Sequence, residues 1–348
     1  MIKKILLVAP ANTSFMPYLD YYIRIYDKHN IRFDVISWDR LSIDDNADGY
    51  QYKDGKKKHA RNLLDYFLFS RFVKSKFKAE RYTRVIVFGL PTLIFTSGLL
   101  KSFNSKGYLI DIRDHHKAIN LPIVKKILKQ AGLVVISSAR FSSWLPSIKY
   151  VVSHNTNEMQ AQGFKALDGK IIISCIGALK DFDVNKQLID KLKNLDWCEL
   201  QFNGEGVINS QLEEYVKAVS AKNVVITGRY IKKQEFEIYS KATFINMLMS
   251  DTLNNNTCLS NRLYNSVIFG VPLIVYQGSY IAEIVKEYNL GLVLSRSSIG
   301  AAEFKLLLAC FDFESYESGR RKFINFVNEQ NLEFEERLVD FSVGQNGR

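Results

Sequence analysis

Several motifs that would indicate a function directly are absent from this sequence. The four cysteines lie far apart and form no CxxC pair, so neither a zinc site nor a disulfide framework is predicted. No Asp-x-Asp motif suited to a metal is found, and no glycine-rich dinucleotide fingerprint follows the first predicted strand. We therefore expect no metal and no cofactor, and a reducing cytoplasm fits the scattered cysteines.

Long apolar runs are missing as well. The longest, residues 85–100, is broken by Gly89, Pro91 and two threonines, which favours a strand and the start of a helix over a membrane span. The N-terminal MIKKILLVAP is followed at once by polar residues and predicts a first strand instead of a signal peptide. We expect a cytoplasmic protein, either soluble or peripheral on the inner face of the cell membrane.

Charge is present in excess, and it is unevenly distributed. The chain of 348 residues has a net charge of +11. Residues 1–155 hold 26 Lys and Arg against 12 Asp and Glu, a net +14, and the remainder holds 21 against 24, a net −3. An anionic partner of the N-terminal half is indicated: phospholipid, a lipid pyrophosphate or nucleic acid.

Apolar strands alternate with helical patterns in both halves, which predicts two doubly wound α/β domains. The first domain is expected over residues 1–155, a linker over 156–169, the second domain over 170–325 and a C-terminal helical segment over 326–348. Residues 39–55 and the stretch just before Ser260 are expected to be loops, and residues 311–341 two helices.

Polar residues follow two predicted strands of the first domain. Asn12, Thr13 and Ser14 come after the first strand, where a doubly wound sheet opens onto its ligand site, so an acceptor contact is expected there. The run DIRDHH, residues 111–116, is the densest titratable cluster in the chain. Asp114 or His115 is predicted to be a catalytic group that acts near neutral pH, and His116 is predicted to contact the acceptor. Alternatively, Asp111 and Arg113 form a structural pair and Asp114 caps a helix.

The segment from Lys56 to Arg84 contains ten Lys and Arg interleaved with leucines and aromatic residues. It predicts an amphipathic helix or helix pair that binds an anionic membrane surface. The alternative is a helix that packs its aromatic residues on the domain core with its lysines outward. Nucleic acid is not expected, because RNA-stacking aromatic residues usually lie on an exposed sheet.

The second domain holds the phosphate-type features. Gly204 and Gly206, at a strand-to-helix turn, are predicted to let backbone N–H groups approach a phosphate. The run TCLSNRLYNSVIFGVPLIVYQGS, residues 257–279, joins a polar loop, a helix, a Gly-Val-Pro turn and a buried strand. Arg262 lies one residue inside the helix start, where a cation and the helix dipole suit a diphosphate. A solvated arginine on a core helix is the alternative.

This run resembles the signature of GT-B glycosyltransferases, most closely the retaining family 4 of bacterial capsule, O-antigen and exopolysaccharide enzymes. The matching residues are Ser260, Asn261, Arg262, Leu263, Gly270 and Pro272. Family members usually carry two glutamates eight positions apart, where this chain has Thr257 and Asn265. The departure leaves open how the donor sugar and ribose are held and whether the reaction retains or inverts. DIRD also resembles a segment of enzymes that transfer amino-sugars to polyprenyl-linked acceptors, without their Leu-Trp-Pro continuation.

The resemblance implies two Rossmann-like domains facing a cleft, with the C-terminal helix crossing back to the N-terminal domain. It also implies donor binding by Lys180, with Lys186 second, and by a nucleobase loop that contains Arg229 and Tyr230. The predicted donor residues are Lys180, Gly204, Gly206, Arg229, Tyr230, Thr257, Ser260, Asn261, Leu263 and Asn265.

The sequence thus predicts a metal-independent glycosyltransferase, of hexosyltransferase type, that moves a sugar from a UDP- or GDP-sugar to a polyprenyl-linked or oligosaccharide acceptor in surface polysaccharide synthesis. Arg262 is expected to stabilise the leaving diphosphate. Two other classes stay open: a nucleotide-sugar epimerase or hydrolase of the same fold, and a non-catalytic sugar-nucleotide binding protein.

Overall fold

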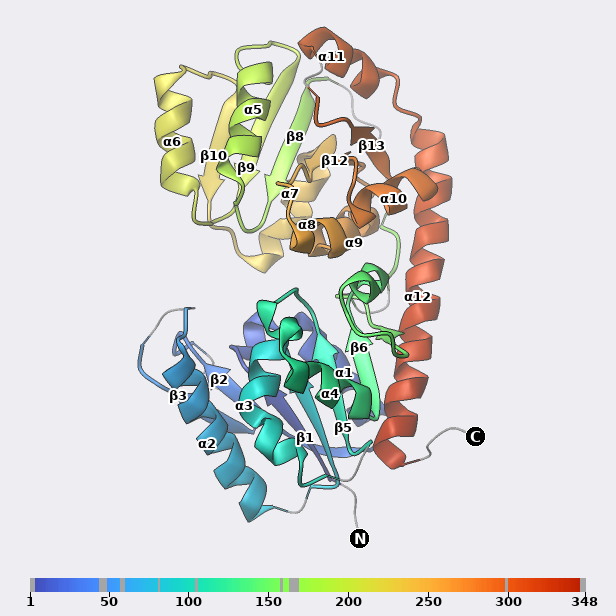
Figure 1. The fold of residues 1–348 in the computed structure, drawn as a ribbon. Coiled ribbons are helices and arrows are strands. Elements are labelled where there is room, and N and C mark those ends of the chain that lie inside the picture. Colours follow the sequence, from blue (N-terminus) through green and yellow to red (C-terminus); the bar gives the residue numbers. More distant parts are fainter. Residues whose placement is uncertain are drawn as a thin grey trace. The chain divides into compact units, whose positions relative to one another are not determined.

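The computed structural model describes residues 4–43, 49–56, 60–80, 82–103, 106–156, 159–162, 169–297 and 300–344. The chain divides into two compact units (Figure 1). Unit 1 comprises Met1–Glu158 and Glu329–Arg348, and unit 2 comprises Met159–Asn328. The linker predicted over residues 156–169 falls largely outside the described residues.

Unit 1 is built on a parallel sheet in the order β3-β2-β1-β4-β5-β6-β7. The chain adds strands to one side of β1 first and then continues from β4 on the other side, so the topological switch point lies between β1 and β4. In open α/β sheets, ligands bind near the carboxyl ends of the strands at such a point. The strands are β1 (Lys4–Ala9), β2 (Arg32–Asp39), β3 (Tyr50–Lys53), β4 (Arg84–Phe88), β5 (Tyr108–Ile112), β6 (Leu133–Ile136) and β7 (Val151–Val152).

Helices cover both faces of this sheet, which is why its central strands are apolar on both sides. Ile5, Leu7 and Ala9 of β1 share a core with α1 (Pro17–Lys28) and with the end of α12 (Phe313–Val343). The remaining helices lie side by side in the order α2 (Leu63–Ala79), α3 (Leu90–Leu100) and α4 (Pro122–Gln130).

Unit 2 repeats the plan with the strand order β10-β9-β8-β11-β12-β13, again parallel, and the reversal lies between β8 and β11. Its strands are β8 (Ile171–Ile176), β9 (Cys198–Asn203), β10 (Val224–Gly228), β11 (Phe244–Asn246), β12 (Leu273–Tyr276) and β13 (Gly291–Leu294). The two sheets confirm the prediction of two Rossmann-like domains.

Two hydrophobic cores flank the sheet of unit 2. One contains α5 (Phe182–Leu192), α6 (Asn209–Ala218) and α11 (Ala301–Ala309). The other contains α7 (Glu235–Lys241), α9 (Asn261–Phe269), α10 (Tyr280–Glu287) and the first part of α12. Helix α9 is thus held in a core along its length, and only its start reaches the carboxyl edge of the sheet.

The C-terminal segment returns to unit 1, as predicted, but the prediction of two helices over residues 311–341 was wrong. Helix α12 is continuous from Phe313 to Val343. Its one glycine, Gly319, does not interrupt it, because a Cβ there would lie 1.6 Å from the carbonyl oxygen of Tyr288 and only glycine permits this packing. In unit 1, Phe334 of α12 packs against the rings of Tyr21 and Tyr22.

Two other segments differ from the sequence expectation. The predicted loop over 39–55 contains β3, an edge strand with a single neighbour, β2. The predicted loop before Ser260 contains a short helix, α8 (Leu253–Thr257), capped by the Thr252 side chain. Both lack the apolar periodicity by which strands and helices are recognised in a sequence.

Candidate functional site

Three segments of unit 2 meet at the point where its strand order reverses: the loop after β8, the loop after β10 and the start of α9. Arg262 joins two of them, because its Nη2 donates to the carbonyl oxygen of Ala178 at 2.8 Å. Its Nη1 lies 3.5 Å from the carbonyl oxygen of Asn246, at the end of β11. Among the described residues no carboxylate forms an ion pair with Arg262; its guanidinium contacts these two carbonyl oxygens and Sγ of Cys175, 3.6 Å from Nη1.

Helix α9 begins where this guanidinium lies. Ser260 is its N-cap, and its hydroxyl accepts a hydrogen bond from the backbone N–H of Arg262 at 3.3 Å. A cation beside the positive end of a helix dipole is a suitable environment for an anion. Arg262 is half-buried and bonded to the β8 loop, so its side chain is positioned by the fold.

Gly177 leaves open space in this loop. A Cβ at Gly177 would meet only the Tyr230 hydroxyl, at 4.0 Å, and its φ of +93° favours glycine. Tyr230, after β10, is half-buried, and burial raises the pKa of its hydroxyl to about 12. A neutral phenol ring beside an open glycine loop is suited to stack on a planar group.

An acidic side chain completes the cluster. Glu235, the first residue of α7, accepts a hydrogen bond from Nδ2 of Asn265 at 3.0 Å and another from the Tyr230 hydroxyl. Burial raises the pKa of this carboxyl, although these two hydrogen bonds and the charge of Lys232 oppose the shift. The site therefore combines a cation at Arg262 with a carboxylate of α7, which is bonded to Asn265, one helical turn along α9 from Arg262.

Gly204 and Gly206 have a structural role that the sequence did not reveal. A Cβ at Gly204 would lie 1.9 Å from the carbonyl oxygen of Gly177, and one at Gly206 would lie 2.0 Å from that of Leu179. The backbone N–H of Gly206 already donates to Oδ1 of Asn209 at 2.7 Å. These glycines let the turn after β9 pack closely against the loop after β8. This packing fixes the backbone of the β8 loop.

The other predicted donor residues are distributed around this cluster. Lys180 and Arg229 are exposed, as is Asn261 at the first position of α9. The buried hydroxyl of Thr257 donates to the carbonyl oxygen of Leu253 at 2.7 Å. The Leu263 side chain is buried in the core, so only its backbone is available to a ligand. The structure thus brings Tyr230, Ser260, Arg262 and Asn265 together.

In unit 1 the run DIRDHH separates into a buried and an exposed part. Arg113 forms a bidentate pair with Asp111, with both N–O distances at 2.5 Å, and Tyr22 donates to the same carboxylate at 2.7 Å. Arg113 also donates to the carbonyl oxygen of Ser153 at 2.8 Å and to Oδ1 of Asn155 at 2.9 Å. The expected structural pair is therefore present, and it ties β5 to the segment that follows β7.

The second half of this run reaches the surface at the carboxyl end of β5. Asp114 is exposed, and His115 is half-buried with its ring edge-on to Trp144, 5.1 Å between centroids. The His116 Nδ1 accepts from the N–H of Ala118 at 3.1 Å, so His116 is the cap of the following turn, in the place expected of Asp114. Burial and the neighbouring His115 lower the pKa of His116.

The loop after β1 is fixed by the buried side chain of Asn12. Asn12 is buried, donates to Oδ1 of Asp39 at 2.5 Å and accepts from the N–H of Arg40 at 3.0 Å. Its side chain therefore fixes the loops after β1 and β2. Thr13 and Ser14 form a 3-10 turn whose Ser14 side chain is exposed, at the same edge of the sheet as Asp114.

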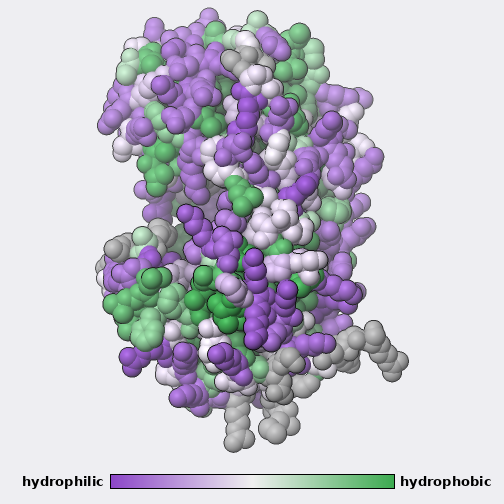
Figure 2. Space-filling model, in the orientation of Figure 1, coloured by the Kyte–Doolittle hydropathy of each residue, from purple (hydrophilic) through white to green (hydrophobic). Residues whose placement is uncertain are grey.

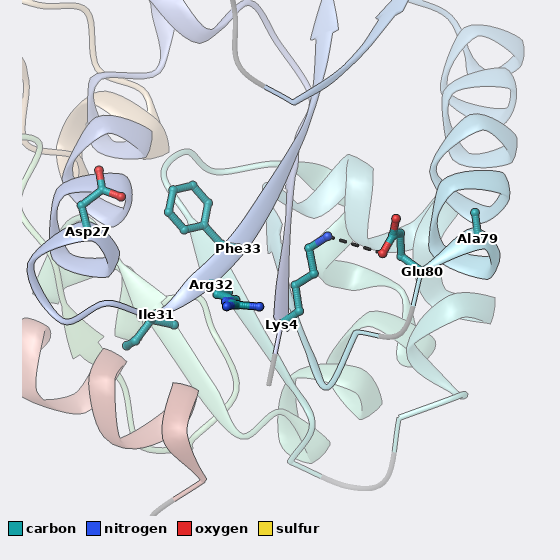
Figure 3. A pocket seen from close by; sticks show the side chains of 7 residues that line it. All are labelled: Lys4, Asp27, Ile31, Arg32, Phe33, Ala79 and Glu80. Carbon is teal, nitrogen blue, oxygen red and sulfur yellow. Dashed lines mark hydrogen bonds and ion pairs between the residues drawn. The ribbon is translucent and has the colours of Figure 1, made fainter. Parts of the chain in front are cut away.

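Two cavities among the described residues lie away from these clusters. One, of about 730 Å³, is an open, polar hollow at the amino ends of β1 and β2 (Figure 3), where Lys4 bonds Glu80 at 3.4 Å. The other, of about 590 Å³, lies in unit 2 between α5 and the start of α11. Within the described ranges, no three of His, Cys, Asp and Glu are grouped to hold a metal ion. The predicted independence of a metal stays a prediction.

Helix α2 presents exposed apolar residues on its first two turns. Leu63 is 76% exposed and Leu64 61%, and Phe67 and Leu68 are exposed as well. We call these four residues the α2 patch; Figure 2 shows hydrophobic side chains grouped on this face of unit 1. Farther along α2, Phe69 stacks on Trp38 and Phe77 packs on Phe103, so part of the aromatic surface is internal, as the alternative reading expected. Lys57 and Lys58 of the predicted basic segment lie outside the described residues.

Comparison with known proteins identifies the fold. No known protein family matches the sequence, and no curated protein does. Among solved structures, sucrose-phosphate synthase from Thermosynechococcus elongatus aligns with a TM-score of 0.70 at 11% identity, over 96% of this chain and 98% of that one. HepE of Anabaena in complex with UDP aligns at 0.66 with 12% identity, over 97% and 100%. The lipopolysaccharide outer core galactosyltransferase WaaB aligns at 0.65 with 13% identity, over 96% and 99%.

At these identities the likeness establishes the fold. The chain has the GT-B fold of these glycosyltransferases, as predicted. Membership of the retaining family 4 stays a prediction. Two residues of the candidate site, Gly177 and Glu235, were not among the predicted site residues.

Proposed function

We propose that this protein is a glycosyltransferase that takes a nucleotide-sugar in unit 2 and an acceptor on unit 1. The observation that carries the proposal is Arg262, a half-buried cation at the start of α9 that contacts the β8 loop. The reaction class is supported by the GT-B fold and by neighbours such as HepE, which was solved with UDP and with UDP-glucose. A UDP- or GDP-sugar of hexose type is the proposed donor.

The chemistry follows from where charge develops. As the bond between the sugar and the diphosphate breaks, negative charge builds on the leaving phosphate, and Arg262 and the start of α9 stabilise it without a metal. Lys180 adds a second cation, and Arg229 and Tyr230 hold the nucleobase. In an inverting reaction, Asp114 or His115 takes the proton of the acceptor hydroxyl; in a retaining reaction it orients the acceptor, and the leaving phosphate takes the proton.

A polyprenyl-linked or oligosaccharide acceptor in bacterial surface polysaccharide synthesis fits unit 1. Its sequence carries the positive charge of the chain, and the α2 patch offers leucine and phenylalanine side chains to an acyl boundary. No helix in the described part of the chain is both long and apolar enough to cross a bilayer. We therefore propose peripheral attachment to the cytoplasmic face of the membrane, through anionic headgroups and the α2 patch.

The proposal is tested by incubating the purified protein with UDP- and GDP-sugars and a polyprenyl-pyrophosphate sugar acceptor, with products identified by mass spectrometry. A glycosylated acceptor and free nucleoside diphosphate are expected. Arg262→Ala should lower kcat/KM roughly 30- to 1,000-fold, which corresponds to a loss of about 2 to 4 kcal/mol of transition-state stabilisation. Arg321→Ala is the matched control, because this exposed arginine of α12 contacts only Glu317 among its described partners.

Other products would contradict the proposal. A new sugar stereoisomer or free sugar formed without acceptor would indicate an epimerase or a hydrolase. Binding of nucleotide-sugar without turnover on any acceptor would indicate a binding protein. Unchanged kinetics in Arg262→Ala would remove this residue from the site.

A further inference from the structure

The cavity of unit 2 between α5 and α11 is lined by two cations. Its volume of about 590 Å³ lies within the range of small-molecule sites. It is bordered by the second half of α5, the ends of β12 and β13 and the start of α11. Neither Arg262 nor Tyr230 is among its described lining residues, so this cavity is separate from the candidate nucleotide site.

The first cation is Arg296, which follows β13 at the carboxyl edge of the sheet. Its Nη1 donates to the carbonyl oxygen of Met249 at 3.2 Å, and its guanidinium lies over the ring of Tyr276, 5.0 Å from the centroid. These contacts join the loop after β13 to the ends of β11 and β12 and hold the guanidinium in place. Within the described ranges no carboxylate pairs with Arg296, so its charge is not neutralised there.

The second cation is Lys191, near the end of α5. Its side chain is half-buried, and its ammonium group forms no ion pair in the part of the chain that the structure describes. Burial lowers the pKa of Lys191, and the charge of Glu303 on α11 only partly opposes this shift. Partial burial of an unpaired cation costs free energy, which an anion bound beside it would offset.

The acidic residue of the described lining, Asp190, does not neutralise these cations. Its carboxylate accepts from Lys193 at 2.9 Å and from the Tyr215 hydroxyl at 2.6 Å, and neither donor is among the described lining residues. The start of α11 adds positive potential, because its N-cap, Gly300, has no side chain to cap the first N–H groups. The cavity therefore favours an anion.

The remaining lining suits a small body attached to that anion. Four buried residues form an apolar floor: Leu188, Leu248, Leu294 and Phe304. An amide and a hydroxyl group lie nearer the surface, on Gln187 and Ser295. A few polar groups over an apolar floor are typical of sites for small organic ligands.

We propose that this cavity binds a phosphorylated sugar, whose phosphate is held by Arg296 and Lys191 and whose hydroxyls bond the amide and hydroxyl groups of the lining. Arginine and lysine form strong, charge-assisted hydrogen bonds with phosphate. This second ligand site goes beyond the proposed function and does not depend on it.

Isothermal titration calorimetry of the full-length protein with glucose 6-phosphate, inorganic phosphate and glucose tests the proposal. Glucose 6-phosphate should bind to the wild type about tenfold more tightly than either of the other two, because only it engages both the cations and the rest of the lining. In Lys191→Gln/Arg296→Gln its affinity should fall about tenfold or more. The control, Lys241→Gln/Arg321→Gln, removes the same charge from two exposed ion pairs and should keep the wild-type affinity.

Arg296→Gln alone changes an exposed side chain and should already weaken binding several-fold, so the test does not depend on the folding of the double variant. Arg262→Ala should bind glucose 6-phosphate as the wild type does. Loss of binding in Arg262→Ala would place the ligand at the start of α9 and overturn the proposal. Wild-type affinity in Lys191→Gln/Arg296→Gln, equal affinities for inorganic phosphate and glucose 6-phosphate, or no binding of glucose 6-phosphate by the wild type would overturn it as well.

Discussion

Buried polar groups in unit 1 show how single residues fix the loops around a site. Asp111 and Arg113 are both buried, and their pair is completed by Tyr22, Ser153 and Asn155. Such a pair adds little net stability, because desolvation offsets the attraction, but breaking it leaves an uncompensated charge. Its effect is to hold the backbone from which Asp114 and His115 project.

His154, next to this pair, predicts how stability depends on pH. Burial lowers the pKa of His154 to about 4 in the folded state, and its ring nitrogen lies 2.7 Å from Oε1 of Gln330. The unfolded value is about 6.5, so the folded state prefers the neutral ring. The difference between the two pKa values stabilises the folded state fully above pH 6.5, and this stabilisation is lost as the pH falls toward 4. When the pH is lowered from 7.5 to 4.5, protonation of this residue in the unfolded state should reduce the free energy of unfolding by about 2 to 3 kcal/mol.

Urea unfolding at several pH values checks this prediction. The wild type should lose stability more steeply than His154→Gln over this pH range, because glutamine does not titrate. Parallel pH profiles of the two proteins would show that His154 does not have the lowered pKa.

Among the elements, α9 depends on α12 for its C-terminal end. Arg320 of α12 is buried and donates to the carbonyl oxygens of Ile268 and Gln162, both at 2.7 Å, and to that of Val267. These include carbonyls of the last turn of α9, where the regular hydrogen-bonding pattern of the helix ends. Arg320 thus holds one end of the helix whose other end carries Arg262.

Removal of this contact should be costly. Arg320→Ala is expected to lower the free energy of unfolding by about 2 to 4 kcal/mol, because several buried carbonyls lose a charged donor. The neighbouring Arg321→Ala should change it by less than about 0.5 kcal/mol, since Arg321 is exposed. Urea denaturation measures both, and equal midpoints for the two variants would contradict this role of Arg320.

Helix α2 makes a prediction about membrane binding. Leu63→Ser combined with Phe67→Ser should weaken binding to vesicles that contain anionic lipid by about tenfold or more, because two exposed apolar side chains of the α2 patch are lost. Leu306→Ser on α11, at another exposed leucine, is the control. Vesicle co-sedimentation at low salt measures binding. Equal binding by all three proteins, or none by the wild type, would rule out the α2 patch.

For the whole molecule, the sequence predicted the two α/β sheets because their central strands are short apolar runs between helical patterns. It missed β3, whose YQYK sequence lies at a sheet edge in a polar segment and is only partly buried. It also divided α12 in two; the helix is continuous through Gly319, whose close packing against Tyr288 is a long-range contact that the sequence does not show.

The site was predictable only where local sequence determines it. Arg262 was selected as a candidate because a helix start and a cation are adjacent in the chain. Glu235 was not, because it meets Asn265 across 30 residues and lies in a run of charged residues without a motif. Gly204 was predicted to let a phosphate approach the backbone, whereas the group that lies close to it is the carbonyl oxygen of Gly177, a contact that only the fold reveals.

The central claim is that unit 2 binds a nucleoside diphosphate at the start of α9. A crystal structure with UDP or GDP tests this most directly. The account predicts the diphosphate within hydrogen-bonding distance of Arg262, beside the open space at Gly177. Nucleotide bound elsewhere, or no nucleotide at saturating concentration, would contradict it.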